Sequence, residues 1–158
     1  MSLFEELRRF LSEPAFLAKV LDWGIVWGTA LGVLFLLASL AIIRERKAIV
    51  ISLCLLGISS LMIIPADYCR QKRGPVDAER AVSMQRHEKM RDRQSWLFYT
   101  QGVIASLAAL LGGDRTGTAK FLTTVSVVGG LIVVVVGLWL QLLELKIIYP
   151  ALRHMASP

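Results

Sequence analysis

Hydrophobic positions in this 158-residue chain are gathered into four blocks that contain no Asp, Glu, Lys, Arg or His. The blocks are residues 23–43, 48–66, 96–113 and 121–143. A helix that crosses a hydrocarbon core about 30 Å thick needs about 20 apolar residues, and each block approaches that length. The pattern therefore predicts an all-α integral membrane protein with four transmembrane helices, in a domain that covers residues 23–158.

The lengths of the polar connections predict how these helices are paired. Only residues 44–47 separate the first two blocks, and a short glycine-rich turn, residues 112–120, separates the last two, so we expect two antiparallel hairpins. The connection at residues 67–95 is longer. Residues 76–95 lack Gly and Pro and are rich in helix formers, so we expect a polar helix that runs into the third span. Asp77 with Arg80 and Glu88 with Arg91 have the spacing of supporting ion pairs.

Residues 1–22 have a different pattern, because apolar residues recur there at helical spacing opposite charged ones. Leu3, Leu7 and Phe10 share a face, which predicts an amphipathic helix lying at the membrane interface. Pro14 is expected to mark a break and the start of a second short helix, which ends near Asp22 where the chain turns into the bilayer. The alternative is that the apolar face docks on a partner protein.

The placement of basic residues predicts the orientation. Overall the chain is 55% hydrophobic, 19% charged and carries a formal net charge of +6. Thirteen Lys and Arg residues fall in the two terminal segments and the 67–95 connection, against five in the two short turns. The positive-inside rule then places both termini and the long connection in the cytoplasm, with the protein in a bacterial inner membrane or its equivalent.

We expect the basic residues of the long connection to contact lipid headgroups rather than nucleic acid, because no nucleic-acid recognition motif accompanies them. These residues are Arg70, Lys72, Arg73, Arg80, Arg86, Lys89, Arg91 and Arg93.

Small residues recur every fourth position in three of the blocks, which lets helices approach closely in lipid. The predicted packing positions are Gly24, Gly28 and Gly32, then Ala105, Ala109 and Gly113, then Ser126 and Gly130. Whether they pack within one chain or against a second copy is left open by the pattern.

The candidate chemistry is sparse. Ion-coupled transporters keep ionisable groups inside the bilayer, and the four blocks have none, so a pump is disfavoured. His87 and His154 lie outside the blocks, so paired histidine ligation of haem between spans is disfavoured, and we predict neither a metal site nor a cofactor. His87 is expected to be a solvated residue on a polar helix. Cys54 and Cys69 would lie about 22 Å apart along one helix, so we predict free thiols rather than a disulfide.

Gln101 is the most polar side chain of the third block, and its amide needs a hydrogen-bond partner at that depth. We expect the partner on a neighbouring helix. The alternative is that Gln101 and hydroxyl residues such as Thr29, Ser60 and Thr124 line a pathway for a neutral solute.

Two hairpins joined by a basic connection, with the sequence RAVSMQRHEKM at residues 80–90 leading into the third span, resemble a bacterial family of four-helix membrane proteins of unknown function. The chain lacks the His-Pro pair that the family carries at the entry to the first span. The resemblance implies the span layout and no chemistry.

These patterns predict a non-enzymatic membrane protein that acts through helix packing and a basic cytoplasmic face, as a structural or accessory subunit of a larger complex or as a homo-oligomer. The alternatives are a small channel or carrier for a neutral solute or lipid, and a pigment- or quinone-binding subunit.

Overall fold

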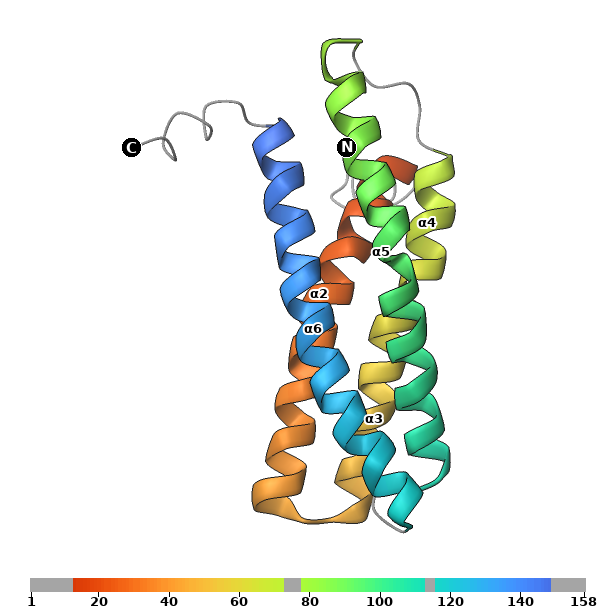
Figure 1. The fold of residues 1–158 in the computed structure, drawn as a ribbon, viewed down its shortest axis with the longest axis vertical. Helices are drawn as coiled ribbons and strands as arrows, with labels where there is room; N and C mark the ends of the chain where they lie inside the picture. The colour runs from red at the N-terminus through yellow and green to blue at the C-terminus, as the bar shows by residue number, and fades with distance from the viewer. Residues whose placement is uncertain (1–12, 73–77, 113–115, 149–158) are drawn as a thin grey trace, which may run out of the picture.

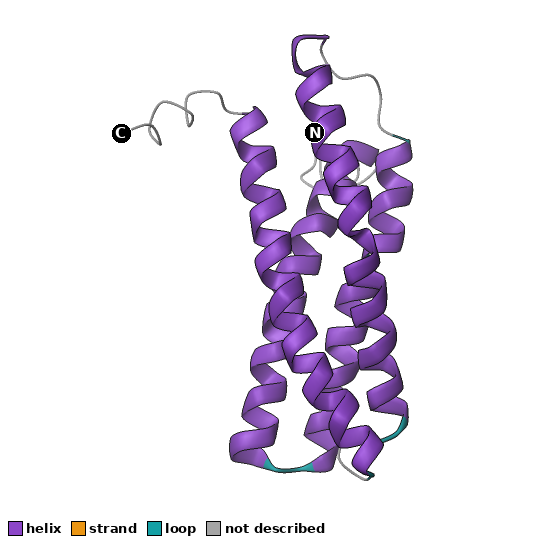
Figure 2. Cartoon of the chain, in the orientation of Figure 1, coloured by secondary structure: helices purple, strands orange, loops and turns teal. Residues whose placement is uncertain are grey.

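The computed structural model describes residues 13–72, 78–112 and 116–148, and every regular element within these ranges is a helix (Figure 2). The elements are α2 (Pro14–Ala38), the π-helical turn η1 (Ser39–Ile43), α3 (Arg46–Leu61), α4 (Ile63–Gln71), α5 (Ala78–Leu110) and α6 (Gly117–Ile148). The interfacial helix predicted for the first residues falls on 1–12, outside the described ranges.

The long helices form an elongated bundle (Figure 1). The helix pair α2 and α3 and the pair α5 and α6 are antiparallel hairpins, α3 lies against α5, and α6 lies against α2, so the ring of neighbours is closed. The first hairpin turns at Arg44, whose φ of 51° is left-handed and whose amide donates to the carbonyl of Ser39. The N-terminal end of α2, the C-terminal ends of α4 and α6 and the polar N-terminal half of α5 lie at the opposite end of the bundle.

Three helical stretches are long and apolar enough to cross a membrane: Phe16–Ile43, Arg46–Gln71 and Gly117–Ile147. They contain the whole of three of the four predicted blocks, residues 23–43, 48–66 and 121–143. The length and low polarity of these helices are those of an integral membrane protein.

The predicted end of a short helix near Asp22 is wrong, because α2 continues without a break from Pro14 to Ala38. Pro14 occupies the first helical turn, where its missing N–H costs nothing. Residues 15–23 contain no Gly or Pro that would end a helix. Asp22 also gains buried partners on other helices, described below, that hold it inside the bundle.

The helical stretch that contains the second apolar block continues beyond residue 66. The α-helical pattern is interrupted at Met62 and resumes as α4, which carries the chain on to Gln71. Proline has no amide hydrogen, and its ring collides with the carbonyl four residues earlier, which here is Leu61. The result is a local break between α3 and α4 rather than the end of the helical stretch.

The polar helix predicted before the third apolar block is present, and it is continuous with the helix that contains this block. Helix α5 has 33 residues, which corresponds to about 50 Å at 1.5 Å per residue. It is therefore longer than a hydrocarbon core is thick, so one part of it extends beyond the apolar part of the bundle.

Small residues lie at the centre of the bundle. A Cβ atom at Gly32 would lie 3.0 Å from the Leu56 Cα, and one at Gly130 would meet Val33. Ala105 and Ala109 belong to a core cluster with Leu36, Leu53 and Leu56, and Ser126 is fully enclosed. Gly28 faces Ser59, whereas Gly24 faces open space. Gly113 lies outside the described residues.

Candidate functional site

A layer of charged side chains crosses one end of the bundle, and Asp22 of α2 is at its centre. Arg91 of α5 donates to Asp22 Oδ1 at 2.6 Å, and Arg70 of α4 donates to Asp22 Oδ2. Asp22 is 4% exposed and Arg91 6%. One buried carboxylate thus joins three helices, and we name Asp22, Asp67, Arg70 and Arg91 the charged layer.

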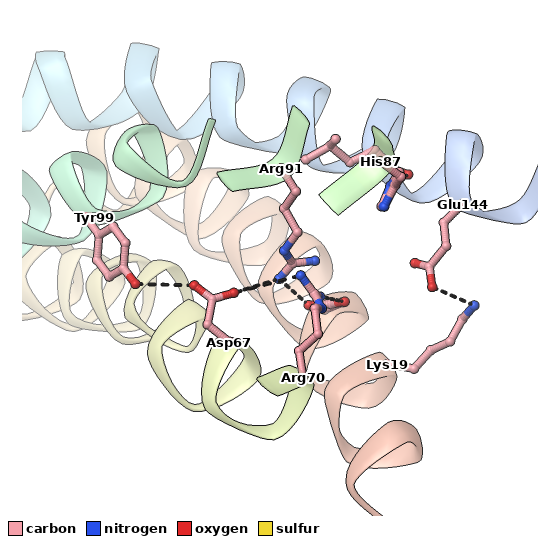
Figure 3. A network of polar contacts seen from close by, with 9 residues as sticks. Lys19, Asp67, Arg70, His87, Arg91, Tyr99 and Glu144 are labelled. Carbon is pink, nitrogen blue, oxygen red and sulfur yellow. Dashed lines mark hydrogen bonds and ion pairs between the residues drawn. The ribbon is translucent and has the colours of Figure 1, made fainter. Parts of the chain in front are cut away.

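Asp67 of α4 is the second carboxylate of the charged layer. Its Oδ1 lies 3.6 Å from Arg91 Nη2 and 3.8 Å from Arg70 Nη1, and its Oδ2 accepts a hydrogen bond of 3.3 Å from the hydroxyl of Tyr99 (Figure 3). Two carboxylates therefore face two guanidinium groups. Burying charges is costly unless they are paired and hydrogen-bonded, and this arrangement meets both conditions.

Two further contacts tie α6 to the same end. Lys19 of α2 lies 3.6 Å from Glu144 of α6 (Figure 3). Nε2 of His87 on α5 lies 3.0 Å from the backbone carbonyl of Leu140 on α6. The expectation of a solvated His87 is wrong, because the side chain is 7% exposed. Its ring packs against α6, a contact that helical spacing along α5 alone does not reveal.

A cavity of about 10 Å³ adjoins the charged layer, and Asp22, Arg91, Phe98 and Gln141 are among its lining residues. Arg91 Nε and Gln141 Oε1 are buried without a hydrogen-bond partner among the described residues. A cavity of about 10 Å³ is close to the smallest that admits one water molecule. It is too small for a substrate or cofactor.

A larger groove of about 310 Å³ lies between α5 and α6. Gln101 lines it and donates a 2.8 Å hydrogen bond to the carbonyl of Ser126, so its amide has the partner on a neighbouring helix that the sequence favours. Thr100 and Thr124 also line the groove, which is otherwise apolar, whereas Thr29 is enclosed in the core.

The basic residues predicted to contact headgroups divide into two groups. Arg70 and Arg91 point into the charged layer, and Arg91 pairs with Asp22 and Asp67 rather than in the predicted pair with Glu88. The side chains that are exposed are Lys72, Arg86, Lys89 and Arg93. Arg73 and the side chain of Arg80 lie outside what the structure describes.

Cys54 and Cys69 are free thiols, as predicted. Within residues 13–72, 78–112 and 116–148, no three His, Cys, Asp or Glu side chains are grouped so as to hold a metal ion. The charged layer is an arrangement for joining helices, because its carboxylates and guanidinium groups are directed at one another.

Sequence reasoning missed the charged layer, although a signal for it exists. Asp22 immediately precedes the first block, Arg70 follows the second by four residues, and Arg91 precedes the third by five. In antiparallel neighbours these positions return to the same end of the bundle. Opposite charges at equal depth on the helices of one bundle were the available clue.

Comparison of the chain with protein-family models, curated proteins and solved structures finds no match, so the resemblance at residues 80–90 stays a prediction.

Proposed function

We propose that the chain crosses the bilayer four times, with both termini and the charged layer on the cytoplasmic side, and acts as a non-enzymatic structural or accessory membrane subunit. One observation carries the proposal: charged residues gather at the two ends of the bundle and are separated by an apolar slab. From Asp22 to Arg44 is 22 residues, or about 33 Å, and from Lys120 to Glu144 is 24 residues, or about 36 Å. Both values are close to the hydrocarbon thickness of about 30 Å.

We propose that α5 also crosses the membrane, as the third of the four spans along the chain, because of its neighbours. It lies between α3 and α6, both of which belong to stretches able to cross a membrane. From Arg91 to the end of α5 at Leu110 is 19 residues, or about 29 Å, which matches the slab. The amide of Gln101 within this part is already hydrogen-bonded to Ser126, which lowers the cost of its burial.

The proposed orientation follows from the excess of Lys and Arg at the end that carries the charged layer. In a background with Cys54→Ser and Cys69→Ser, single cysteines are placed at Lys89 and at Lys47, which are exposed at opposite ends. A membrane-impermeant maleimide added to intact cells should label the Lys47→Cys protein and spare the Lys89→Cys protein. The reverse result would contradict the orientation.

The assignment as a subunit is supported by how the ionisable groups are used. The charged layer and the Lys19–Glu144 pair link helices to one another, and the apolar slab has no group suited to moving protons or ions. We infer that the protein acts through its surfaces. Mild-detergent extraction followed by native mass measurement should give a defined oligomer or a stoichiometric partner, and a stable lone monomer would contradict the proposal.

A further inference from the structure

The groove between α5 and α6 opens onto the outer surface of the bundle within the proposed apolar slab. Both helices line it, with Trp96, Thr100 and Ile104 from α5 and Thr124, Val128 and Ile132 from α6. From Trp96 to Ile104 is eight residues, or about 12 Å along the helix axis. This depth is close to one leaflet, since half of a 30 Å core is about 15 Å.

Basic side chains continue the same face of α5 beyond the groove. Arg93, Lys89 and Arg86 precede Trp96 by three, seven and ten residues, spacings that keep side chains on one side of a helix. All three are exposed, and none forms an ion pair with another described residue. The groove therefore has a basic extension at its cytoplasmic end.

Helix α6 adds to this extension. The His87–Leu140 contact sets the level of the two helices, so the turn that carries Trp139 lies beside the α5 segment that carries Lys89. Trp139 is 44% exposed and Lys146, two turns further, is also exposed. Indole rings favour the headgroup level, so Trp96 and Trp139 mark where the apolar groove meets the basic extension.

Two acidic side chains of α5 line a different pocket. Glu88 and Asp92 line a separate polar pocket with Asp67 and Arg70, toward α4 rather than α6. Glu144 of α6 is buried against Lys19. Among the described residues, no acidic side chain lines the groove, and the α5 side chains that continue its face are basic, which favours a negatively charged occupant.

We propose that this surface binds an anionic phospholipid of the cytoplasmic leaflet. The phosphate lies against Arg93 and Lys89, Arg86 and Lys146 add to the positive field, and one acyl chain occupies the groove. The inference rests on the proposed membrane insertion. Each Lys or Arg near the headgroups is expected to raise the preference for anionic over zwitterionic lipid about fivefold.

The test uses two tryptophans as reporters: Trp96, which lines the groove, and Trp139, on the next part of α6. The full chain, with Trp23→Phe and Trp27→Phe, is placed in phosphatidylcholine nanodiscs that contain increasing mole fractions of phosphatidylglycerol brominated on its acyl chains. Bromine quenches nearby indole fluorescence. We expect half-maximal quenching at a mole fraction at least fivefold lower than with brominated phosphatidylcholine.

Two sets of variants locate the site. Lys89→Gln with Arg93→Gln should lower the preference at least fivefold, so that the two brominated lipids quench at similar mole fractions, whereas Lys47→Gln with Lys120→Gln, at the other end of the bundle, should leave it unchanged. Val128→Phe fills the groove and should reduce quenching by both lipids. Ile58→Phe, at an exposed position of α3 outside the groove lining, is its control.

The possible failures are distinguishable. Equal quenching by the two brominated lipids in the starting protein would overturn the lipid site and leave the proposed insertion intact. A chain that does not enter nanodiscs would overturn the insertion and the lipid site together. An inverted orientation would be seen in the maleimide labelling and would not alter the lipid preference, because nanodiscs expose both leaflets.

Discussion

Arg91 on α5 donates to the carboxylate of Asp22 on α2 at 2.6 Å, although 69 residues separate them in the sequence, and both side chains are more than nine-tenths buried. The pair joins the first hairpin to the second at the end of the bundle where the polar part of α5 begins. With Arg70 and Asp67 it forms a layer in which opposite charges are balanced. The layer therefore aligns α2, α4 and α5 at one depth.

Removing the central carboxylate should destabilise the bundle strongly. Asp22→Ala leaves two guanidinium groups with only Asp67 as a partner, and breaking a buried ion pair costs about 3–5 kcal/mol. We expect a large fall in the thermal midpoint measured in detergent micelles. Glu45→Gln, an exposed charge at the other end, is the control, and equal midpoints for the two variants would show that the layer is not structural.

Tyr99→Phe should have a much smaller effect. The hydroxyl donates a 3.3 Å hydrogen bond to Asp67 at an exposed position, and Asp67 retains contacts with Arg70 and Arg91. A hydrogen bond of this kind contributes about 1 kcal/mol or less. In the same micelle assay, the thermal midpoint of this variant should lie close to that of the starting protein. A fall as large as that of Asp22→Ala would contradict the smaller role given to the Tyr99 hydrogen bond.

Gly32 and Gly24 should respond in opposite directions to alanine. A Cβ at Gly32 would lie 3.0 Å from the Cα of Leu56, and backbone cannot move aside cheaply, so we expect Gly32→Ala to destabilise by about 1–3 kcal/mol. Gly24 has open space, so Gly24→Ala should gain up to about 1 kcal/mol from helix propensity. Unfolding in mixed micelles measures the change in stability of both variants. If Gly24→Ala destabilised the protein and Gly32→Ala did not, the close contact of α2 with α3 would not be at Gly32.

Gln101→Leu should cost about 0.5–1.5 kcal/mol, because it removes one interhelical hydrogen bond to the Ser126 carbonyl while keeping most of the side-chain volume. Gly129→Ala is the companion variant, since a Cβ there would overlap the Gln101 side-chain oxygen. We expect Gly129→Ala to be destabilising alone and to be tolerated better when combined with Gln101→Ala. Strict additivity of the two changes in unfolding free energy would contradict the contact between these residues.

The helical content, the two hairpins and the approximate positions of three membrane-length stretches were predictable from hydrophobic periodicity, because block length and turn length act locally. Helix ends were less predictable. The break that precedes Pro65 does not end the helical stretch, and α2 begins nine residues before the first apolar block, since neighbours hold Asp22 inside the bundle.

The roles of individual charged residues depended on contacts that spacing does not encode. Arg70 and Arg91 belong to the same basic connection as Arg86 and Lys89, yet the first two are directed inward and the second two outward. Likewise His87 packs against α6 although its sequence neighbours are polar. The direction of each side chain follows from which helix lies next to it.

By itself the sequence determined that the chain is helical, that most of its length is apolar enough for a membrane, and that its charges lie outside four blocks, because these properties depend on composition along the chain. Only the tertiary structure decided which charges meet, since Asp22 and its arginines come from three helices. It also decided that α5 and α6 leave a groove beside a basic surface. Both features depend on the rotation and level of neighbouring helices, which are set by packing between distant segments.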